Sequence, residues 1–185
     1  MDVSAKEPGK GNVISSLTRG SMEVSLKRIS VDSRHILENL FSYYVYDMSE
    51  FMGWGPNSDG LFTFNPETLD SYWKETSHVP YFIYIDKEIA GFALVRHYPI
   101  EPEVFDIDQF FVLRKFKGKG IGKKVFLAVV ANHLGKWQIR VLKENEAALN
   151  FWISAVKNRV GSSYEVSLDI DVDLEMYFIR FEVAS

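Results

Sequence analysis

Apolar residues recur at helical spacing in the front part of the chain. From Ser33 to Phe51 they fall at steps of three and four, which predicts one helix with a broad apolar face. Asp32 or Ser33 is placed to cap the first turn of this helix. A second, short helix is expected in "NPETLDSYW", because Asn65 is a capping residue and Pro66 occupies the first helical position.

Shorter apolar runs, bounded by polar turns, predict strands. The expected strands cover 22–29, 81–85, 89–98, 104–113, 137–142, 163–170 and 174–183. The polar turn "DKE" joins the second and third of them into a hairpin, and "DVD" separates the last two. Two further helices are expected over 121–133 and 145–158, the second capped by Asn145.

The predicted order is strand, two helices, three strands, helix, strand, helix and two strands, which places the chain in the α+β class. Residues 1–21 are rich in Gly, Ser and Lys and lack a sustained apolar period. We interpret them as a flexible leader, either an expression tag or a natural tail, and expect one folded domain over 22–185.

Composition narrows the functional classes. With 185 residues, 46% of them apolar, the chain can bury a core of its own. A net charge of −4 gives no overall attraction to nucleic acid or to anionic lipid. The absence of cysteine excludes disulfides, thiolate metal sites and a cysteine nucleophile. No apolar run is long enough for a membrane span and no signal peptide is visible, so we expect a cytoplasmic protein.

One basic stretch departs from this acidic background. "VLRKFKGKGIGKK", residues 112–124, carries six cations and three glycines between a predicted strand and a predicted helix. The first N–H groups of a helix are unpaired and lie at the positive end of the helix dipole, and glycine lets a backbone curl closely around an anion. The stretch therefore predicts a phosphate cradle. Its spacing matches neither a Walker A loop nor the GxGxxG dinucleotide fingerprint.

Two motifs in this region resemble those of the GNAT N-acetyltransferase superfamily. The acetyl-CoA loop of that superfamily is matched by Val112, Lys117, Gly120 and Gly122, with Lys117 in place of the usual Arg or Gln. A second motif, Asn-x-x-Ala-x-x-x-Tyr on the helix after the next strand, is matched by "NEAALNFW", which ends in a Trp. The resemblance implies a mixed, mostly antiparallel sheet of about seven strands flanked by about four helices.

The same resemblance implies that the chain binds acetyl-CoA. The backbone of Val112 and Arg114 would hold the pantetheine arm, and Asn145 and Trp152 would face the arm from the other wall. The pyrophosphate would meet the amides of the loop, with added charge from Lys123. The loop residues are Lys117, Gly118, Lys119, Gly120, Ile121 and Gly122.

Acetyl transfer to an amine needs a base, and three carboxylates are candidates. Asp106 and Asp108 share one face of the strand that leads to the loop, and we place Val112 on that same face. Asp106 stands about where histone acetyltransferases of the superfamily keep a glutamate. Glu50 lies at the end of the first helix, in the region that walls the acceptor pocket in the superfamily. Surface carboxylates are the alternative interpretation of all three.

The general acid is less clearly marked. Trp152 occupies the position of the superfamily's frequent tyrosine, and an indole N–H does not donate a proton usefully at neutral pH. Tyr44 or Tyr46 of the first helix can substitute, or the thiolate leaves without assistance. The four histidines show no ligand-like spacing, so we expect no metal.

Three hypotheses about function follow. The first is an acetyl-CoA-dependent N-acetyltransferase that acts on a small-molecule amine or a peptide, with aromatic residues of the first helix lining the acceptor pocket. The second is an acyl-CoA-binding protein with little or no turnover, as the Trp at position 152 suggests. The third, a nucleic-acid binder, is opposed by the acidic net charge. A homodimer is compatible with all three.

Overall fold

The computed structural model describes residues 22–184. The predicted leader, residues 1–21, lies outside the described residues. Seven strands form one sheet in the order β1-β2-β3-β4-β5-β7-β6. The strands are β1 (Val24–Arg28), β2 (His78–Ile85), β3 (Glu88–His97), β4 (Val104–Val112), β5 (Gly135–Leu142), β6 (Tyr164–Asp171) and β7 (Leu174–Val183). This confirms the predicted α+β class and the mostly antiparallel sheet.

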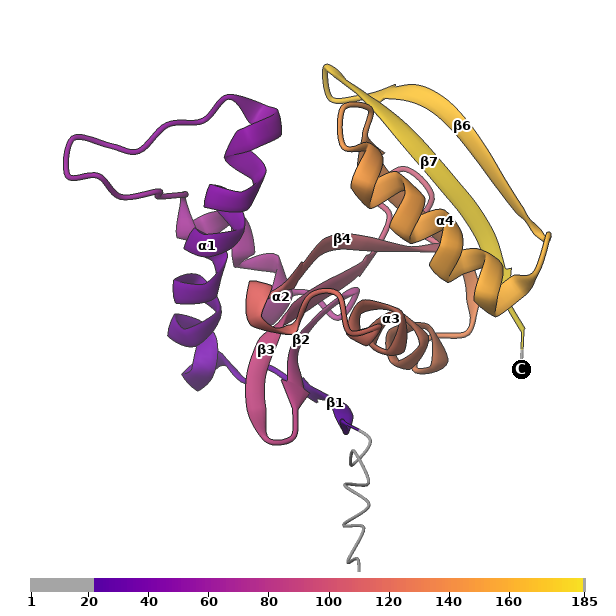
Figure 1. The fold of residues 1–185 in the computed structure, drawn as a ribbon, viewed down its shortest axis with the longest axis horizontal. Helices are drawn as coiled ribbons and strands as arrows, with labels where there is room; N and C mark the ends of the chain where they lie inside the picture. Colours follow the sequence, from indigo (N-terminus) through magenta and orange to yellow (C-terminus); the bar gives the residue numbers. More distant parts are fainter. Residues whose placement is uncertain (1–21, 185) are drawn as a thin grey trace, which may run out of the picture.

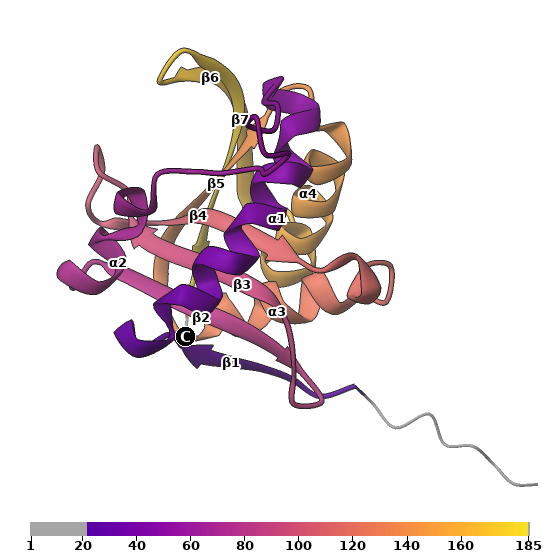
Figure 2. The ribbon, with the colours of Figure 1, turned by 90° about the vertical axis from the view of Figure 1, so that its left-hand side faces the viewer.

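Four α-helices cover the two faces of the sheet (Figures 1 and 2). They are α1 (Arg34–Met52), α2 (Ser71–Lys74), α3 (Ile121–Ala131) and α4 (Glu146–Val160). Helices α1 and α2 pack on one face over a core that includes Phe41, Phe92 and Phe111. Helices α3 and α4 pack on the other face over a larger core around Phe126 and Trp137.

One neighbouring pair of strands is parallel. Strands β4 and β5 run in the same direction, with α3 as the connection between them, whereas every other described pair is antiparallel. A parallel pair needs such a crossover because a tight turn cannot join the end of one strand to the start of the next. The predicted basic loop is therefore the first part of the crossover.

Local chemistry explains some helix ends and not others. The Asn65 side chain accepts a hydrogen bond from the Glu67 N–H at 3.1 Å, as its capping pattern predicts. The expected second helix is a 3₁₀ turn (Pro66–Leu69) followed by the four residues of α2. The predicted cap of α1 is wrong, because Ser33 makes no capping bond and a 3₁₀ turn (Val31–Ser33) precedes the helix instead.

A glycine sets the distance between β3 and the end of β4. Gly91 pairs with Val112 and has φ 155°, and a Cβ atom built on it would lie 1.9 Å from the carbonyl oxygen of Phe111. The carbonyl oxygen of Phe111 is a backbone atom, so it cannot avoid the Cβ atom by a change of side-chain rotamer. The last residues of β4, which lead into the basic loop, can thus lie against β3 only because residue 91 has no side chain.

We expect Gly91→Ala to destabilise the protein by about 1–3 kcal/mol or more, because the two strands must separate. Urea unfolding followed by circular dichroism would measure the change. Gly55→Ala is the control, since a Cβ atom there meets nothing within 4 Å. Equal stability of the two variants would contradict the close-approach explanation.

Candidate functional site

The parallel strands β4 and β5 separate after three residue pairs. Val104, Phe105 and Asp106 pair with residues 136–138. No pairing is found among the described residues between the rest of β4 and the rest of β5, and Figure 2 shows the two strands diverging. An unpaired strand edge presents N–H and C=O groups that can bind an extended ligand. The opening leaves such an edge on residues 107–112 of β4.

The opening leads directly into the glycine-rich loop. Gly118 and Gly120 have φ of 77° and 72°, the left-handed region that glycine adopts without strain. Gly120 is the residue before α3, so the unpaired N–H groups of the first turn of α3 follow it. Gly122 packs against the ring of Phe151 on α4, where a Cβ atom would lie 2.9 Å from two ring carbons. The loop is therefore shaped by backbone conformation and by a close helix contact.

Several cations of the loop already have partners. Arg114 and Lys117 both donate to the carboxylate of Asp47 on α1, at 3.0 and 2.9 Å. Lys115 donates to both carboxylate oxygens of Glu88. Lys123 donates to the hydroxyl group of Ser154 at 2.7 Å. Lys119 is exposed.

The end of α1 and the loop enclose a small hollow. Its volume is about 160 Å³, and it is lined by Tyr46, Asp47, Ser49, Glu50 and Arg114. Two of the predicted catalytic residues, Tyr46 and Glu50, thus lie beside a predicted cofactor residue, Arg114. The sequence did not mark Asp47, although it stands one turn of helix before Glu50.

Two predicted cofactor residues have structural contacts of their own. The Asn145 side chain accepts a hydrogen bond from the Ala148 N–H at 3.0 Å and so caps α4. Trp152 is 7% exposed, and its ring lies 5.0 Å from Phe110 and 4.8 Å from Phe151. No hydrogen bond from the Trp152 indole N–H to another described residue is found. Trp152 is therefore a core residue with an aromatic environment.

The two aspartates of β4 belong to a network of charges on the α1 and α2 face. Asp106 is fully buried and accepts from Arg140 at 2.7 Å and from Arg96 at 3.2 Å. Asp108 is ion-paired to the same two arginines, at 3.1 and 2.9 Å, and accepts from the Tyr72 hydroxyl group at 2.8 Å. Burial raises the pKa of Asp106, and the two arginines oppose this shift.

Arg140 is the centre of this network. Besides both aspartates of β4, it donates to Asp171 at the end of β6. Burial disfavours its positive charge, but Asp106, Asp171 and Asp108 outweigh burial and raise the pKa of the guanidinium group. Sequence reasoning missed Arg96, Arg140, Tyr72 and Asp171, which come from four other elements.

The prediction that Asp106 and Asp108 share a face with Val112 is wrong. The register of β3 and β4 shifts between Leu94 and Val95, so that one extra residue of β4 forms a bulge. The bulge turns Val112 into the core beneath α3 and α4, whereas both aspartates lie on the opposite face. Strict alternation cannot be continued across a bulge.

Tyr44 lies on the same face as the two aspartates. Its ring packs edge-on to Phe92 and Phe111, with centroids 6.0 and 6.2 Å apart. Burial raises the pKa of its hydroxyl group, and the charge of Asp108 adds to the shift. A phenol that stays protonated at neutral pH can donate a proton or a hydrogen bond.

Polar atoms without a partner lie along the two diverging strands. Both side-chain polar atoms of Gln138 on β5 and the Oε1 atom of Gln109 on β4 are buried and lack a hydrogen bond within the described residues. Gln109 belongs to the part of β4 that has no pairing with β5. Buried polar groups are normally satisfied. The open edge, the unsatisfied Gln109 and the glycine loop together fit an extended ligand with an anionic end, as acetyl-CoA is.

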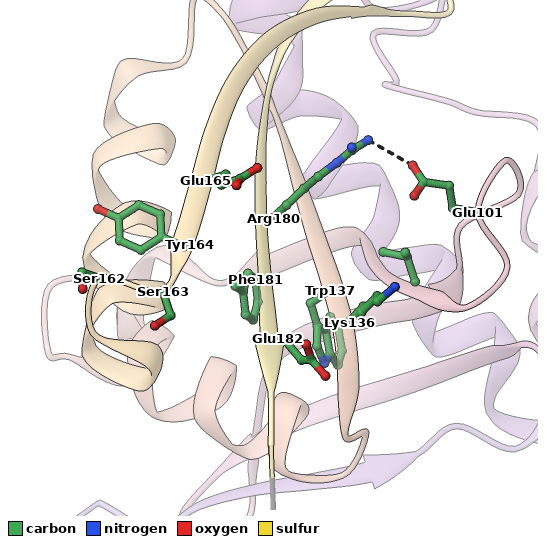
Figure 3. A pocket seen from close by; sticks show the side chains of 11 residues that line it. Glu101, Lys136, Trp137, Ser162, Ser163, Tyr164, Glu165, Arg180, Phe181 and Glu182 are labelled. Carbon is green, nitrogen blue, oxygen red and sulfur yellow. Dashed lines mark hydrogen bonds and ion pairs between the residues drawn. The ribbon is translucent and has the colours of Figure 1, made fainter.

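A larger hollow, of about 520 Å³, lies elsewhere, between the loop after β3 and the start of β6 (Figure 3). Its walls carry charges of both signs, and Arg180 pairs with Glu101 across it at 3.1 Å. None of the predicted site residues lines it. Its size alone therefore does not identify it as the reaction site.

Among residues 22–184, no group of three or more histidine or carboxylate side chains is placed to hold a metal ion. Within the same residues, none of the helices combines the length and the apolar character that crossing a membrane requires.

Comparison with known proteins identifies relatives of this chain. The model of the acetyltransferase (GNAT) family matches residues 42–153. No curated protein matches the sequence. Among solved structures, an acetyltransferase from Thermus thermophilus has a TM-score of 0.64 at 13% identity, covering 85% of this chain and 96% of its own.

Two further structures share the fold. The aminoglycoside acetyltransferase AAC(6')-Ib, in complex with coenzyme A, has a TM-score of 0.62 at 18% identity, covering 86% of this chain and 95% of its own. A chimera of the spermidine N-acetyltransferase SpeG from Vibrio cholerae and hSSAT has a TM-score of 0.59 at 11% identity, covering 86% and 94%. At these identities the likeness concerns the fold alone.

We expect Asp106→Asn to destabilise the protein by about 1.5–3 kcal/mol, because it weakens the charge-assisted hydrogen bonds that the buried Asp106 carboxylate accepts from Arg96 and Arg140. Urea unfolding would measure the loss. Asp70→Asn is the matched control, since Asp70 makes ion pairs of the same kind while 28% exposed and should lose less than about 1 kcal/mol. If Asp106→Asn unfolds at the same urea concentration as the wild type, the ion pair between Asp106 and Arg140 does not anchor β4 to β5.

Proposed function

Because the chain belongs to the acetyltransferase (GNAT) family, we propose that it transfers an acetyl group from acetyl-CoA to the primary amine of a small molecule or a peptide. The observation that carries the proposal is the opening between β4 and β5, which leads through one 3₁₀ turn (Arg114–Phe116) into the glycine loop and the first turn of α3. The opening offers unpaired backbone for an extended arm, and the loop offers unpaired N–H groups for an anion.

When bound, acetyl-CoA supplies an acetyl group that is activated as a thioester. We assign the backbone of Val112 and Arg114 to the pantetheine arm and the amides of residues 117–122 to the pyrophosphate. Asn145 keeps its amide N–H₂ group available, because its capping bond uses the side-chain oxygen only. Trp152 contributes by shape, since it packs against aromatic side chains in the wall below the arm.

The acceptor amine is an ammonium group at neutral pH and must lose a proton before it attacks the thioester. Of the three carboxylates singled out from the sequence, the geometry favours Glu50 for this task. Glu50 is exposed and lines the hollow beside Tyr46. The oxygens of Asp106 and Asp108 are instead occupied by Arg96 and Arg140. We therefore assign the two aspartates to positioning Arg140 across the strand opening.

The leaving thiolate is stabilised by a nearby proton donor. Tyr44 and Tyr46 are both on α1, and they differ in environment. Tyr46 is 52% exposed at the rim of the hollow, whereas Tyr44 is partly buried against the core beneath α1. The raised pKa of Tyr44 keeps its phenol protonated and able to donate a hydrogen bond to the thiolate, and we assign this role to Tyr44.

Exposed aromatic residues point to an acceptor with apolar surface. Tyr43 and Tyr46 in the second half of α1 and Trp54 just beyond it are 59%, 52% and 46% exposed. Phe41 of the same helix belongs to the core instead, because its ring is buried between Phe64 and Phe92. Two of the structural neighbours are named for cationic amines, aminoglycosides and spermidine, and we include such amines among the acceptors to be tested.

The second hypothesis, an acyl-CoA-binding protein with little turnover, is favoured by Trp152. Its ring fills the space among Phe110, Phe126 and Phe151 and offers no proton for the leaving group. Release of free thiol from acetyl-CoA, measured across a panel of amines, separates the two functions. Acceptor-dependent release supports the transferase, and binding of acetyl-CoA without release by any amine supports the alternative. A cytoplasmic location and a homodimer stay predictions, and light scattering would test the second.

We expect Gly120→Glu to abolish measurable acetyl-CoA binding, because a carboxylate at the start of α3 repels the pyrophosphate and fills the loop. The substituted side chain has open space around its Cβ atom, so the fold should survive with the penalty of a left-handed residue, about 1–2 kcal/mol. Gly161→Glu is the matched control, since Gly161 also has positive φ and open surroundings but follows the far end of α4. Calorimetry would measure both. Wild-type affinity in Gly120→Glu would remove the loop assignment.

We expect Glu50→Gln to lower kcat/KM by about 10²-fold or more and to remove the acidic limb of the pH–rate profile, because the amide takes no proton. Acetyl-CoA affinity should stay within about twofold, since the glycine loop is unchanged. Glu75→Gln, an exposed carboxylate beyond α2, is the control. An unaltered pH–rate profile in Glu50→Gln would assign proton removal to another group.

A further inference from the structure

Asp47 joins the end of α1 to the basic loop. Its two carboxylate oxygens accept one hydrogen bond from Arg114 at 3.0 Å and one from Lys117 at 2.9 Å. Arg114 is the first residue of the short 3₁₀ turn (Arg114–Phe116) that follows β4, and Lys117 comes directly after this turn. A single carboxylate thus pairs with two cations of the basic stretch, one of which, Lys117, belongs to the loop that the sequence assigns to the pyrophosphate.

The two sides of this contact differ in freedom. The Asp47 side chain is 19% exposed, whereas those of Lys117 and Arg114 are 52% and 75% exposed. Asp47 has a short side chain on a helix, while Lys117 and Arg114 have long, flexible side chains with many rotamers. The cations can therefore turn toward another anion while the carboxylate stays in place.

Asp47 is ionised in this arrangement. Burial opposes ionisation, but the hydrogen bonds from Lys117 and Arg114 outweigh it and lower the pKa of the carboxyl group. A carboxylate with two charge-assisted donors resembles, in charge and in geometry, the phosphate oxygen that such donors bind. In the free protein, Arg114 and Lys117 consequently have an anionic partner without a ligand.

We propose that Asp47 is a positioning residue that occupies Arg114 and Lys117 until the phosphate groups of the ligand take them. The proposal rests on the proposed function, because it requires the loop to bind the pyrophosphate of acetyl-CoA. The ligand displaces one carboxylate from two cations, so each ion pair formed with phosphate replaces an ion pair with Asp47. Asp47 keeps the basic loop folded against α1 before binding, at the expense of affinity for the ligand.

The opposite role for Asp47 would be purely structural. If Asp47 holds the loop in the one shape that can bind phosphate, its removal weakens binding. If Asp47 competes with phosphate, its removal strengthens binding. The two roles predict changes of opposite sign in the dissociation constant of coenzyme A.

Calorimetry with coenzyme A distinguishes these roles. For Asp47→Asn at low salt, about 50 mM, we expect the Kd to fall roughly three- to tenfold, the range that one or two exposed ion pairs provide. The gain should largely disappear at about 1 M salt, where exposed charges are screened. A Kd that rises or does not change in Asp47→Asn would overturn the proposal.

Glu88→Gln is the matched control. Glu88 pairs with Lys115 of the same 3₁₀ turn at 2.6 and 2.7 Å, and its replacement changes the net charge by the same amount. We expect its Kd to stay within about twofold of wild type. If Asp47→Asn and Glu88→Gln increase the affinity for coenzyme A equally, net charge alone sets the affinity. This outcome would also overturn the specific role of Asp47.

A double variant tests whether the effect passes through the loop lysine. In a Lys117→Met background, Asp47→Asn should increase the affinity for coenzyme A by less than half as much as it does in the wild type. The reason is that one of the two cations released by the substitution is missing. A full gain in that background would contradict the proposed exchange.

Inorganic pyrophosphate separates this proposal from the proposed function. If the folded wild-type protein binds pyrophosphate but not coenzyme A, the proposed function fails, and the effect of Asp47→Asn is then measured with pyrophosphate. If the wild type binds coenzyme A and Asp47→Asn binds it more weakly, the cofactor assignment of the proposed function stands and the role of Asp47 as a competitor fails. If the wild type binds neither compound, both proposals fail.

Discussion

The ion pair between Arg140 of β5 and Asp106 of β4 spans the point at which the central sheet stops being continuous. Backbone pairing between the two strands ends at Asp106 and Gln138, and Arg140 lies two residues further along β5. Its guanidinium group reaches back to Asp106 and also to Asp108. Ion pairs between side chains thus link β4 and β5 where the two strands no longer form backbone hydrogen bonds with each other.

Burying this network has a cost. Two arginines and the carboxylate of Asp106 leave water, and burial alone disfavours every one of those charges. The arrangement is retained because the charges are paired and hydrogen-bonded, with Tyr72 and Asp171 supplying further contacts. The network links β4 to β5 beyond the point where their backbone pairing ends.

The sequence was most informative where structure is local. The strand and helix patterns predicted seven strands and the three long helices close to their observed bounds, because each pattern depends on residues within one element. The Asn65 and Asn145 caps were found for the same reason. The glycine loop was recognised from its spacing, and its position between β4 and α3 is as predicted. The family match confirms the resemblance that the loop and the next helix carry.

Tertiary structure decided what the residues of the site contact. A single bulge in β4 moved Val112 to the face opposite Asp106, and no local signal marks the extra residue. Arg96, Arg140 and Tyr72 reach the two aspartates from β3, β5 and α2, and Asp47 reaches the loop from α1. The sequence by itself determined most of the elements, the position of the glycine loop and the family, because backbone preferences and motif spacing act over short distances along the chain. Only the folded chain decided which carboxylates are paired and which are free, since ion pairing depends on distances in space between residues far apart in sequence.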